Sequence, residues 1–259
     1  MAAKPLILVT NDDGITAPGI RNLIEVMQEL GEVVIVAPDS PQSGMGHAVT
    51  LNKPLRLDEV DMYPGIKAYQ CSGTPVDCVK LAVDIVLDRK PDLLVSGINH
   101  GSNSSINVIY SGTMSAAVEG AIEGISSIGF SLLDYSYKAN FKPLIPFVRQ
   151  IAKEVLEKKM PAGTLLNVNF PKVESIDAIQ GVKICRQALA KWQESFVART
   201  DPNGRQYYWM TGNFVNDDLG EDTDEWALKH NYVSVVPVQF DLTDHHQIPF
   251  LNRWNFHVQ

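Results

Sequence analysis

The chain has 259 residues, of which 45% are hydrophobic and 20% are charged, and its formal net charge at pH 7 is −8. This composition is typical of a globular protein, and the length allows one large α/β domain with a core of ordinary size. The negative net charge argues against general binding to a nucleic-acid backbone, which requires a basic surface.

The apolar runs of the sequence indicate where the protein acts. The first run, after Met1–Pro5, spans only four residues, which is too short for a secretory signal. No other run is long enough to span a bilayer. We therefore expect a cytoplasmic protein without membrane partners.

The chain begins with short apolar runs separated by an amphipathic segment. Strands are predicted at 6–9 and 33–36, where continuous apolar residues indicate parallel strands covered on both faces. Between them, Pro18 suits the first turn of a helix, apolar residues follow at helical spacing, and Gly31 marks the end. This order predicts a strand–helix–strand unit.

The same alternation continues to about residue 170. Thr74, Pro75 and Asp77 predict the start of a helix that runs to about Asp88. The other predicted elements are a strand in PDLLVSGIN, a helix from Ser111, a strand in SIGFSLL, a helix over 141–158 and a strand in TLLNVNF. Repeated units of this kind predict an α/β fold with a doubly wound, mostly parallel sheet.

The pattern changes after residue 174. Residues 175–231 contain two aromatic stretches around the turn sequence Asp201-Pro202-Asn203-Gly204, which predicts a β-hairpin. The chain therefore divides into a core (1–174), a hairpin arm (175–231), and a strand returning to the core with a C-terminal tail (232–259). Because so much aromatic surface should not stay exposed, we expect the arm to pack against another subunit.

Polar, glycine-containing loops follow three of the predicted strands, and a fourth loop leads into a helix. Parallel strands place their carboxyl ends on one edge of the sheet, where open α/β sheets bind ligands. The loops are Asn11–Gly14, Asp39–Gly46, Gly97–Gly101 and Asn103–Thr113. We therefore expect all four to meet at one site.

The adjacent carboxylates of Asp12 and Asp13 indicate a metal. They can approach one site only if the chain turns beside them, which Gly14 permits. Two like charges held close together are unfavourable unless a cation relieves the repulsion. With the oxygens of Ser43 and Asn99, the donor set favours Mg²⁺, Mn²⁺ or Ca²⁺ over zinc. A solvated loop with a capping Asp is the alternative.

The stretch Ser111-Gly112-Thr113 opens a helix and indicates an anion site. Free N–H groups and hydroxyls at a helix start bind anions, although a simple helix cap uses the same residues. A cation, an anion cradle and water together suit phosphoester hydrolysis. His47 and His100 are candidates for proton donation or phosphate binding, although such histidines more often make hydrogen bonds within loops.

Several motifs in one order resemble the SurE family, the stationary-phase survival nucleotidases. They are LVTNDDGITAPGI, VAPDSPQSGMGHAVT, CSGTPVDCVKLA, PDLLVSGINHGSN, YSGTMSAAVEG and TDEWALKHNYVSVVP, and the resemblance extends from residue 6 to about 238. It implies a Rossmann-like core and a phosphatase of nucleoside 5′- and 3′-monophosphates that uses one divalent cation per subunit. It also implies a homodimer or homotetramer with exchanged C-terminal segments.

The resemblance assigns roles to individual residues. The metal ligands of the family fall on Asp12, Asp13, Ser43 and Asn99, and the two aspartates are the expected catalytic residues. The candidates for binding the substrate phosphate are Asn11, Gly44, Asn103, Ser111, Gly112 and Thr113. Two positions depart from the family pattern. Gln42 stands where Arg is usual, which removes a positive charge, and Ser105 stands where Gly is usual, which stiffens its loop.

Three hypotheses follow from these residues. In the first, water activated at the cation with help from Asp12 or Asp13 attacks phosphorus in line, while the cation and the helix start stabilise the developing charge. In the second, one Asp is a covalent nucleophile. In the third, the chain is a regulatory module that binds nucleotides without turnover, although adjacent carboxylates would repel a phosphate unless a cation intervened.

Overall fold

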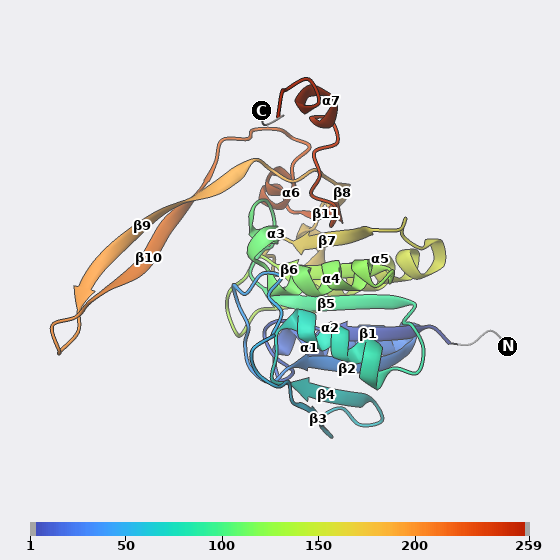
Figure 1. Ribbon diagram of the computed structural model, residues 1–259. Helices are drawn as coiled ribbons and strands as arrows, with labels where there is room; N and C mark the ends of the chain where they lie inside the picture. The colour runs from blue at the N-terminus through green and yellow to red at the C-terminus, as the bar shows by residue number, and fades with distance from the viewer. Residues whose placement is uncertain (1–3, 257–259) are drawn as a thin grey trace.

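A large twisted sheet forms the centre of the molecule in the computed structural model, which describes residues 4–256 (Figure 1). Its nine strands lie in the order β3-β4-β2-β1-β5-β6-β7-β11-β8. They are β1 (Leu6–Thr10), β2 (Glu32–Pro38), β3 (Leu57–Glu59), β4 (Lys67–Cys71), β5 (Leu93–His100), β6 (Ser127–Leu132), β7 (Thr164–Phe170), β8 (Gly181–Ile184) and β11 (Tyr232–Gln239). Residues 1–3 and 257–259, at the ends of the predicted core and tail, lie outside the described range.

Within the run β4-β2-β1-β5-β6-β7, every pair of adjacent strands is parallel. Strand β3 is antiparallel to β4, and β11 is antiparallel to β7, while β8 is parallel to β11. The prediction of a doubly wound, mostly parallel α/β sheet is confirmed. The strand predicted to return to the core is β11, but the sequence pattern did not indicate its antiparallel pairing with β7.

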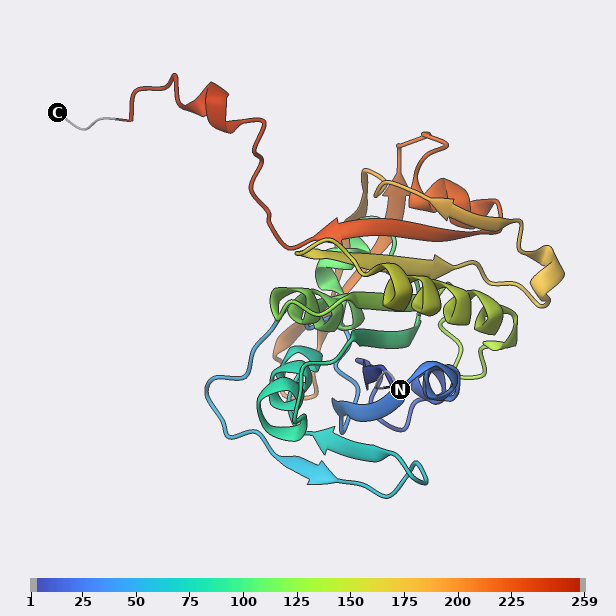
Figure 2. The same ribbon diagram turned by 90° about the vertical axis from the view of Figure 1, so that its right-hand side faces the viewer.

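Helices cover both faces of the sheet (Figure 2). Helices α1 (Pro18–Leu30) and α5 (Ile145–Lys158) pack on one face, and α2 (Pro75–Leu81) and α4 (Gly112–Ile122) pack on the other. The shorter helices are α3 (Asn107–Tyr110), α6 (Asp224–Lys229) and α7 (Ile248–Leu251). A π-helical turn (Ala82–Val86) extends α2, and 3₁₀ turns occupy Lys142–Leu144 and Ile176–Ala178.

Helix α1 shows how the local sequence produces these layers. Pro18 stands in its first turn, and its buried face includes Ile20, Leu23 and Met27 at helical spacing. The helix ends before Gly31, as predicted, but the physical reason differs. The backbone of Gly31 is extended, with φ −158°, and a Cβ there would lie 2.6 Å from the carbonyl oxygen of Pro5. Close approach of the first strand, not a left-handed turn, therefore requires glycine.

The chain changes direction across the sheet between β1 and β5. Strands β2 and β4 follow β1 on one side, whereas β6 and β7 follow β5 on the other. Such a switch point leaves a crevice at the carboxyl ends of the two central strands. The pairing of β5 with β6 shifts its register between Ser96 and Asn99, and Gly97 has φ +127°. This irregularity shapes the backbone from which Asn99 projects.

A long hairpin projects from the body (Figure 1). It consists of β9 (Ala190–Thr200) and β10 (Gln206–Asn216), which form a separate two-stranded antiparallel sheet. The predicted turn sequence lies at its tip. Within the segment 175–231, β8 joins the edge of the main sheet and α6 packs against β11, so the hairpin is the part that projects.

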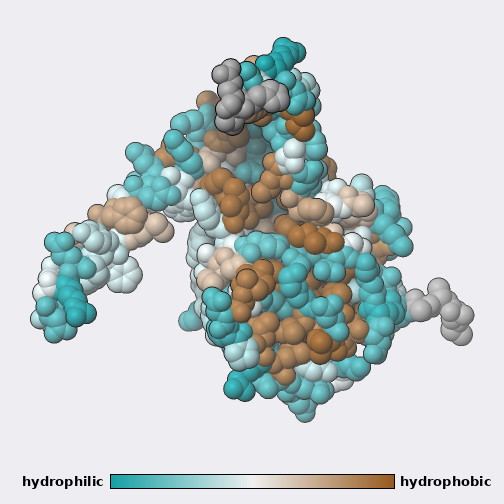
Figure 3. Space-filling view, viewed as in Figure 1, coloured by the Kyte–Doolittle hydropathy of each residue, from teal (hydrophilic) through white to brown (hydrophobic). Residues whose placement is uncertain are grey.

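The molecule has two further surface features. The tail after β11 leaves the body and carries α7 (Figure 2). Figure 3 shows apolar side chains gathered on the face of the body over α2 and α4, where Ile85 and Ile122 are exposed. Within residues 4–256, no helix combines the length and apolar character needed to cross a membrane.

Candidate functional site

A cleft of about 280 Å³ opens where the carboxyl ends of β1 and β5 meet the start of α4. Its lining includes Asp12, Ser43, Gly44, Asn99, Asn103 and Ser111, all of which were predicted from the sequence. The other lining residues are His100, Gly101, Ser102, Asn107, Tyr110 and Tyr135. Loops far apart in the chain therefore meet at one site, as the order of the strands predicted.

The turn after β1 brings Asp12 into the wall of this cleft and places Asp13 beside His100, another residue of the lining. Gly14 has φ +96°, a conformation that strongly favours glycine. The side-chain amide of Asn11 donates to the carbonyl oxygen of Gly14 at 2.9 Å and so holds the turn. Asp12 is buried, whereas Asp13 is only half-buried. The turn therefore gives the two neighbouring carboxylates different surroundings.

Each carboxylate accepts hydrogen bonds from a different element. The hydroxyl of Thr113 donates to Asp12 Oδ1 at 2.5 Å, and the backbone N–H of His100 donates to Asp13 Oδ2 at 3.2 Å. Burial, and then the neighbouring Asp13 carboxylate, raise the pKa of Asp12 to about 6 despite the hydrogen bonds from Thr113. Burial also raises the pKa of Asp13, against the hydrogen bond from His100. Two carboxylates destabilised in this way attract a cation.

The donor atoms around Asp12 and Asp13 suit a hard cation. The side-chain N–H of Asn99 donates to the carbonyl oxygen of Gly101 at 2.8 Å, so Oδ1 is the side-chain atom that could coordinate a cation. The Oδ1 atom of Asn11 is buried and has no hydrogen-bond partner within residues 4–256. In that range no cluster of three or more His, Cys, Asp or Glu residues could hold a metal, so a cation here needs serine and asparagine oxygens as well.

Glycine at position 112 allows α4 to approach this donor set. A Cβ on Gly112 would lie 2.7 Å from Cβ and 2.9 Å from Oδ2 of Asp12. Ser111 caps the helix, since its Oγ accepts from the N–H of Met114 at 3.0 Å. The hydroxyl of Thr113, which is expected at the anion site, donates to Asp12. The start of α4 therefore contacts the carboxylate directly, and Ser111 faces the cleft.

Asn103 is held on the cleft wall by a buried polar network. Its N–H donates to Asn169 Oδ1 and its side-chain amide donates to Ser131 Oγ, both at 2.8 Å. The amide of Asn167 donates to the carbonyl oxygen of Asn103, also at 2.8 Å. Because these partners lie on β6 and β7, the sheet itself fixes the position of Asn103.

Comparison with known proteins identifies the family of this chain. A family model described as Survival protein SurE matches residues 7–194. The chain belongs to the SurE family. The 5′-nucleotidase SurE of Flavobacterium psychrophilum is 64% identical over 254 residues, which cover 98% of each chain. That of Bacteroides thetaiotaomicron is 48% identical over 252 residues, which cover 97% of this chain and 96% of the relative.

A solved structure supports the same assignment. The crystal structure of the SurE protein from Aquifex aeolicus superimposes with a TM-score of 0.83 at 38% sequence identity, and the match covers 96% of this chain and 98% of that one. The resemblance drawn from the sequence motifs is confirmed. The fold described above is the SurE fold.

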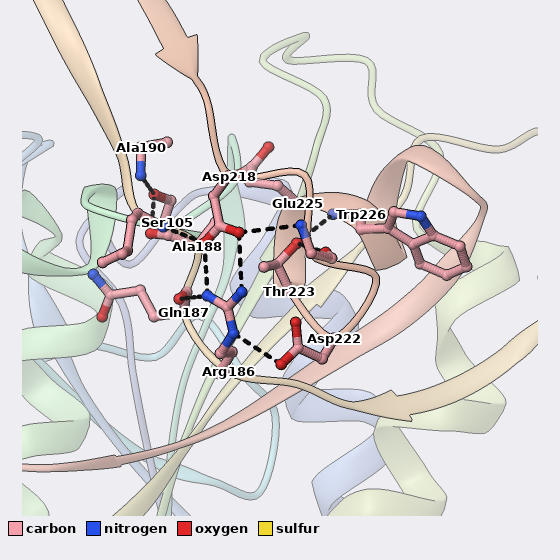
Figure 4. A network of polar contacts seen from close by, with 12 residues as sticks. Ser105, Arg186, Gln187, Ala188, Ala190, Asp218, Asp222, Thr223, Glu225 and Trp226 are labelled. Atoms are coloured by element: carbon pink, nitrogen blue, oxygen red, sulfur yellow. Dashed lines mark hydrogen bonds and ion pairs between the residues drawn. The ribbon is translucent and has the colours of Figure 1, made fainter.

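Ser105, at a position where the resemblance implied glycine, has φ +53°, a conformation that favours glycine. Here its N–H donates to Asp224 at 2.7 Å. Its hydroxyl donates to the carbonyl oxygen of Ala188 at 2.8 Å, a contact drawn in Figure 4. The Ser104 hydroxyl donates to Glu225. The loop after Asn103 is thus attached to α6 and to the root of the hairpin.

Gln42, at a position where the resemblance implied arginine, contributes through its backbone. Its N–H donates to the carbonyl oxygen of Asp12 at 2.7 Å, while its side-chain amide lies 3.4 Å from the carbonyl oxygen of Ser40. It therefore fixes the loop beside Ser43 but brings no positive charge to the cleft.

The two histidines of the SurE loops make structural contacts. The His100 ring stacks on Tyr137 with 5.7 Å between centroids, and its Nδ1 lies 2.9 Å from the carbonyl oxygen of Ser136. His47 Nε2 lies 2.8 Å from a carboxylate oxygen of Glu119. Glu119 was not predicted from the sequence, although a single carboxylate among the alanines and glycines of a helix is a signal of a buried charge.

Proposed function

We propose that this chain is a divalent-metal-dependent nucleotidase that hydrolyses nucleoside 5′- and 3′-monophosphates to nucleoside and phosphate. The observation that carries the proposal is the meeting of Asp12 and the start of α4 in a cleft at the switch point of the sheet, with Asp13 next to them on the backbone of His100. The names of the relatives, 5′-nucleotidase SurE at 64% identity, support this activity. A regulatory module that binds nucleotides without turnover is the alternative.

Asp12, Asp13, Ser43 and Asn99 would hold one Mg²⁺, Mn²⁺ or Ca²⁺ per subunit. When bound, the cation supplies Lewis acidity toward the phosphoryl group and lowers the pKa of water at the site. The raised pKa values of the two aspartates, caused mainly by burial, support this role, because a bound cation stabilises a buried carboxylate in its ionised form.

The side chains of this protein would perform three tasks in the reaction. Asp12 or Asp13 would accept the proton of the attacking water, since a carboxylate held within reach of that water can act as a general base. Ser111, Gly112 and Asn103 would bind phosphate oxygens, where the positive end of α4 favours negative charge. Thr113 would orient the Asp12 carboxylate through its hydroxyl group.

We also propose that the protein acts in the cytoplasm as a homodimer or homotetramer. Two exposed apolar areas support self-association: the hairpin, where Phe196, Trp209 and Met210 are exposed, and the face over α2 and α4, where Ile85 and Ile122 are exposed (Figure 3). A second copy of the chain would remove these side chains from water.

Phosphate release from AMP, measured on metal-free protein with and without added Mn²⁺, tests the proposed function. We expect release only in the presence of Mn²⁺. Binding of AMP without phosphate release at saturating Mn²⁺ would favour the regulatory module, and equal release in the presence of a chelator would contradict metal dependence.

A further inference from the structure

Helix α4 carries one buried carboxylate that the catalytic scheme does not use. The side chain of Glu119 is only 3% exposed, and it lies two turns after Gly112 on the same helix. Its Oε2 atom lies 2.8 Å from Nε2 of His47, and its Oε1 atom accepts a hydrogen bond from Nζ of Lys80. A buried charge is tolerated when its oxygens are paired in this way.

The contacts of Glu119 fix the protonation of its partners. Burial by itself would raise the pKa of Glu119, but the hydrogen bonds from His47 and Lys80 outweigh it and hold the pKa below its usual value. Glu119 is therefore ionised at neutral pH. Because Nε2 of His47 faces a carboxylate oxygen, that nitrogen carries the proton, and the bond forms whether the ring is neutral or charged.

His47 is one of the anchors of the loop that carries Ser43. On one side of Ser43, the N–H of Gln42 donates to the carbonyl oxygen of Asp12 at 2.7 Å. On the other side, the N–H of Gly46 donates to the carbonyl oxygen of Tyr110 at 3.2 Å, and His47 follows directly. Between these anchors lies Gly44, where a Cβ would meet no atom within 4 Å. The position of Ser43 therefore depends on how the two ends of this short span are held.

We propose that His47, Glu119 and Lys80 are positioning residues that hold the Ser43 loop on α4 and thereby set the affinity of the site for its divalent cation. Helix α4 places Gly112 against Asp12, so the same rigid element locates both the carboxylate and the Ser43 loop. The inference rests on the proposed function, because it concerns the cation which that function requires. It extends that function to residues outside the cleft.

Three substitutions at His47, with one control elsewhere, separate the effect of its hydrogen bond from that of its bulk. His47→Leu and His47→Ser remove the donor to Glu119, and the Ser variant adds no apolar surface at a position whose side chain is 36% exposed. His47→Gln places an amide N–H close to the position of Nε2 and should restore the bond. Arg149→Leu is the control, since it removes a 2.6 Å ion pair to Glu29 between α1 and α5.

The main measurement is calorimetric binding of Mn²⁺ to each metal-free variant, without substrate. We expect the Kd for Mn²⁺ to rise roughly tenfold in His47→Leu and His47→Ser, the lower end of the usual effect of residues behind metal ligands, and to stay within about threefold of wild type in His47→Gln and Arg149→Leu. The inhibition constant of inorganic phosphate, measured at saturating Mn²⁺, should change less than about twofold in all variants, because the phosphate contacts are intact.

The outcomes distinguish this inference from the proposed function. Wild-type protein that binds no Mn²⁺ or releases no phosphate from AMP contradicts the proposed function itself. If the Leu and Ser variants bind Mn²⁺ as tightly as wild type does, the positioning role alone is contradicted. The same holds if Mn²⁺ binding is weakened as much in the Gln variant as in the Leu and Ser variants. If the Leu variant does not fold, the Ser variant decides in the same way.

Discussion

Asp12 is the residue whose ionised form, proposed to bind the cation, destabilises the folded metal-free protein. Burial and the neighbouring Asp13 carboxylate raise its pKa from 3.8 to about 6, so the folded protein holds a proton there more tightly than the unfolded chain. The contribution of Asp12 to stability is complete below pH 3.8 and is lost as the pH rises through 6.

We predict that Asp12→Asn stabilises the metal-free protein at pH 7.5 and that this advantage disappears below about pH 4. The expected difference is about 1.4 kcal/mol for each unit of pKa shift, or up to roughly 3 kcal/mol. Urea denaturation of both proteins across this range, with a chelator present, measures it. Parallel stability curves would show that Asp12 is not destabilised when ionised.

Thr113 acts on Asp12 through its hydroxyl, so its substitution should affect the cation before the phosphate. In Thr113→Val, the lost hydrogen bond should raise the pKa of Asp12 further and weaken Mn²⁺ binding by roughly 1–3 kcal/mol. Phosphate inhibition at saturating Mn²⁺ should hardly change. Ser111→Ala is the matched variant, and it should weaken phosphate inhibition with less effect on Mn²⁺. If Thr113→Val instead weakened phosphate inhibition and Ser111→Ala weakened Mn²⁺ binding, the roles assigned to these two residues would be wrong.

Ser105 combines a conformation that favours glycine with a hydroxyl that glycine lacks. Ser105→Gly relieves the positive φ but loses the bond to Ala188, whereas Ser105→Ala loses the bond and keeps the backbone strain. We expect Ala to destabilise the protein by about 1–3 kcal/mol and Gly by about 1 kcal/mol less. Denaturant unfolding of both variants compares them. Equal stability of Gly and Ala would show that the backbone at this position is unstrained.

At the residue scale, the sequence predicted which side chains meet but not all of their contacts. Asp12, Ser43 and Asn99 could be placed together because parallel strands end on one edge of the sheet. The hydrogen bond from Thr113 to Asp12 could not be predicted, because it depends on how closely α4 approaches β1. Glu119 was missed for the same reason, since its partners come from a distant loop and from α2.

At the scale of elements, the continuous apolar runs and the helix starts were sufficient to locate the central strands and helices. The irregular end of β5 was not predictable, because it arises where a Cβ on Gly97 would lie 2.3 Å from the carbonyl oxygen of Phe130 on the next strand. The edge strands β3 and β8 were also unspecified. They pair with distant segments, so their positions depend on the whole sheet and not on local pattern.

The hairpin is longer than its aromatic stretches indicated, with 11 residues in each strand. Nearly all of β9 is exposed on both faces, so no alternation of buried and exposed residues marks its limits. Its root is fixed by Trp192, whose indole N–H donates to Asn107 at 2.8 Å. The root is therefore part of the body, whereas the outer hairpin has no such support in the described residues.

The outer hairpin provides a test of self-association for the whole molecule. Phe196 pairs with Met210, and Ser195 pairs with Thr211 just inside them, so deleting Phe196–Met210 leaves two strands in register for closure by a short Gly-Ser turn. We expect the deletion to lower the oligomeric state measured by light scattering and to leave Mn²⁺ binding intact. A monomeric wild-type protein, or a deletion variant of unchanged size, would contradict the assignment of the hairpin to a subunit interface.

The central claim is that the two carboxylates after β1 form the reactive centre of a nucleotidase. The most direct measurement is the rate of phosphate release from AMP by wild type, Asp12→Asn and Asp13→Asn at saturating Mn²⁺, with circular dichroism to confirm that each variant is folded. We predict that each substitution lowers kcat/KM by roughly a hundredfold or more. A folded variant that keeps nearly wild-type turnover would contradict the role of the residue it replaces, and two such variants would contradict the account.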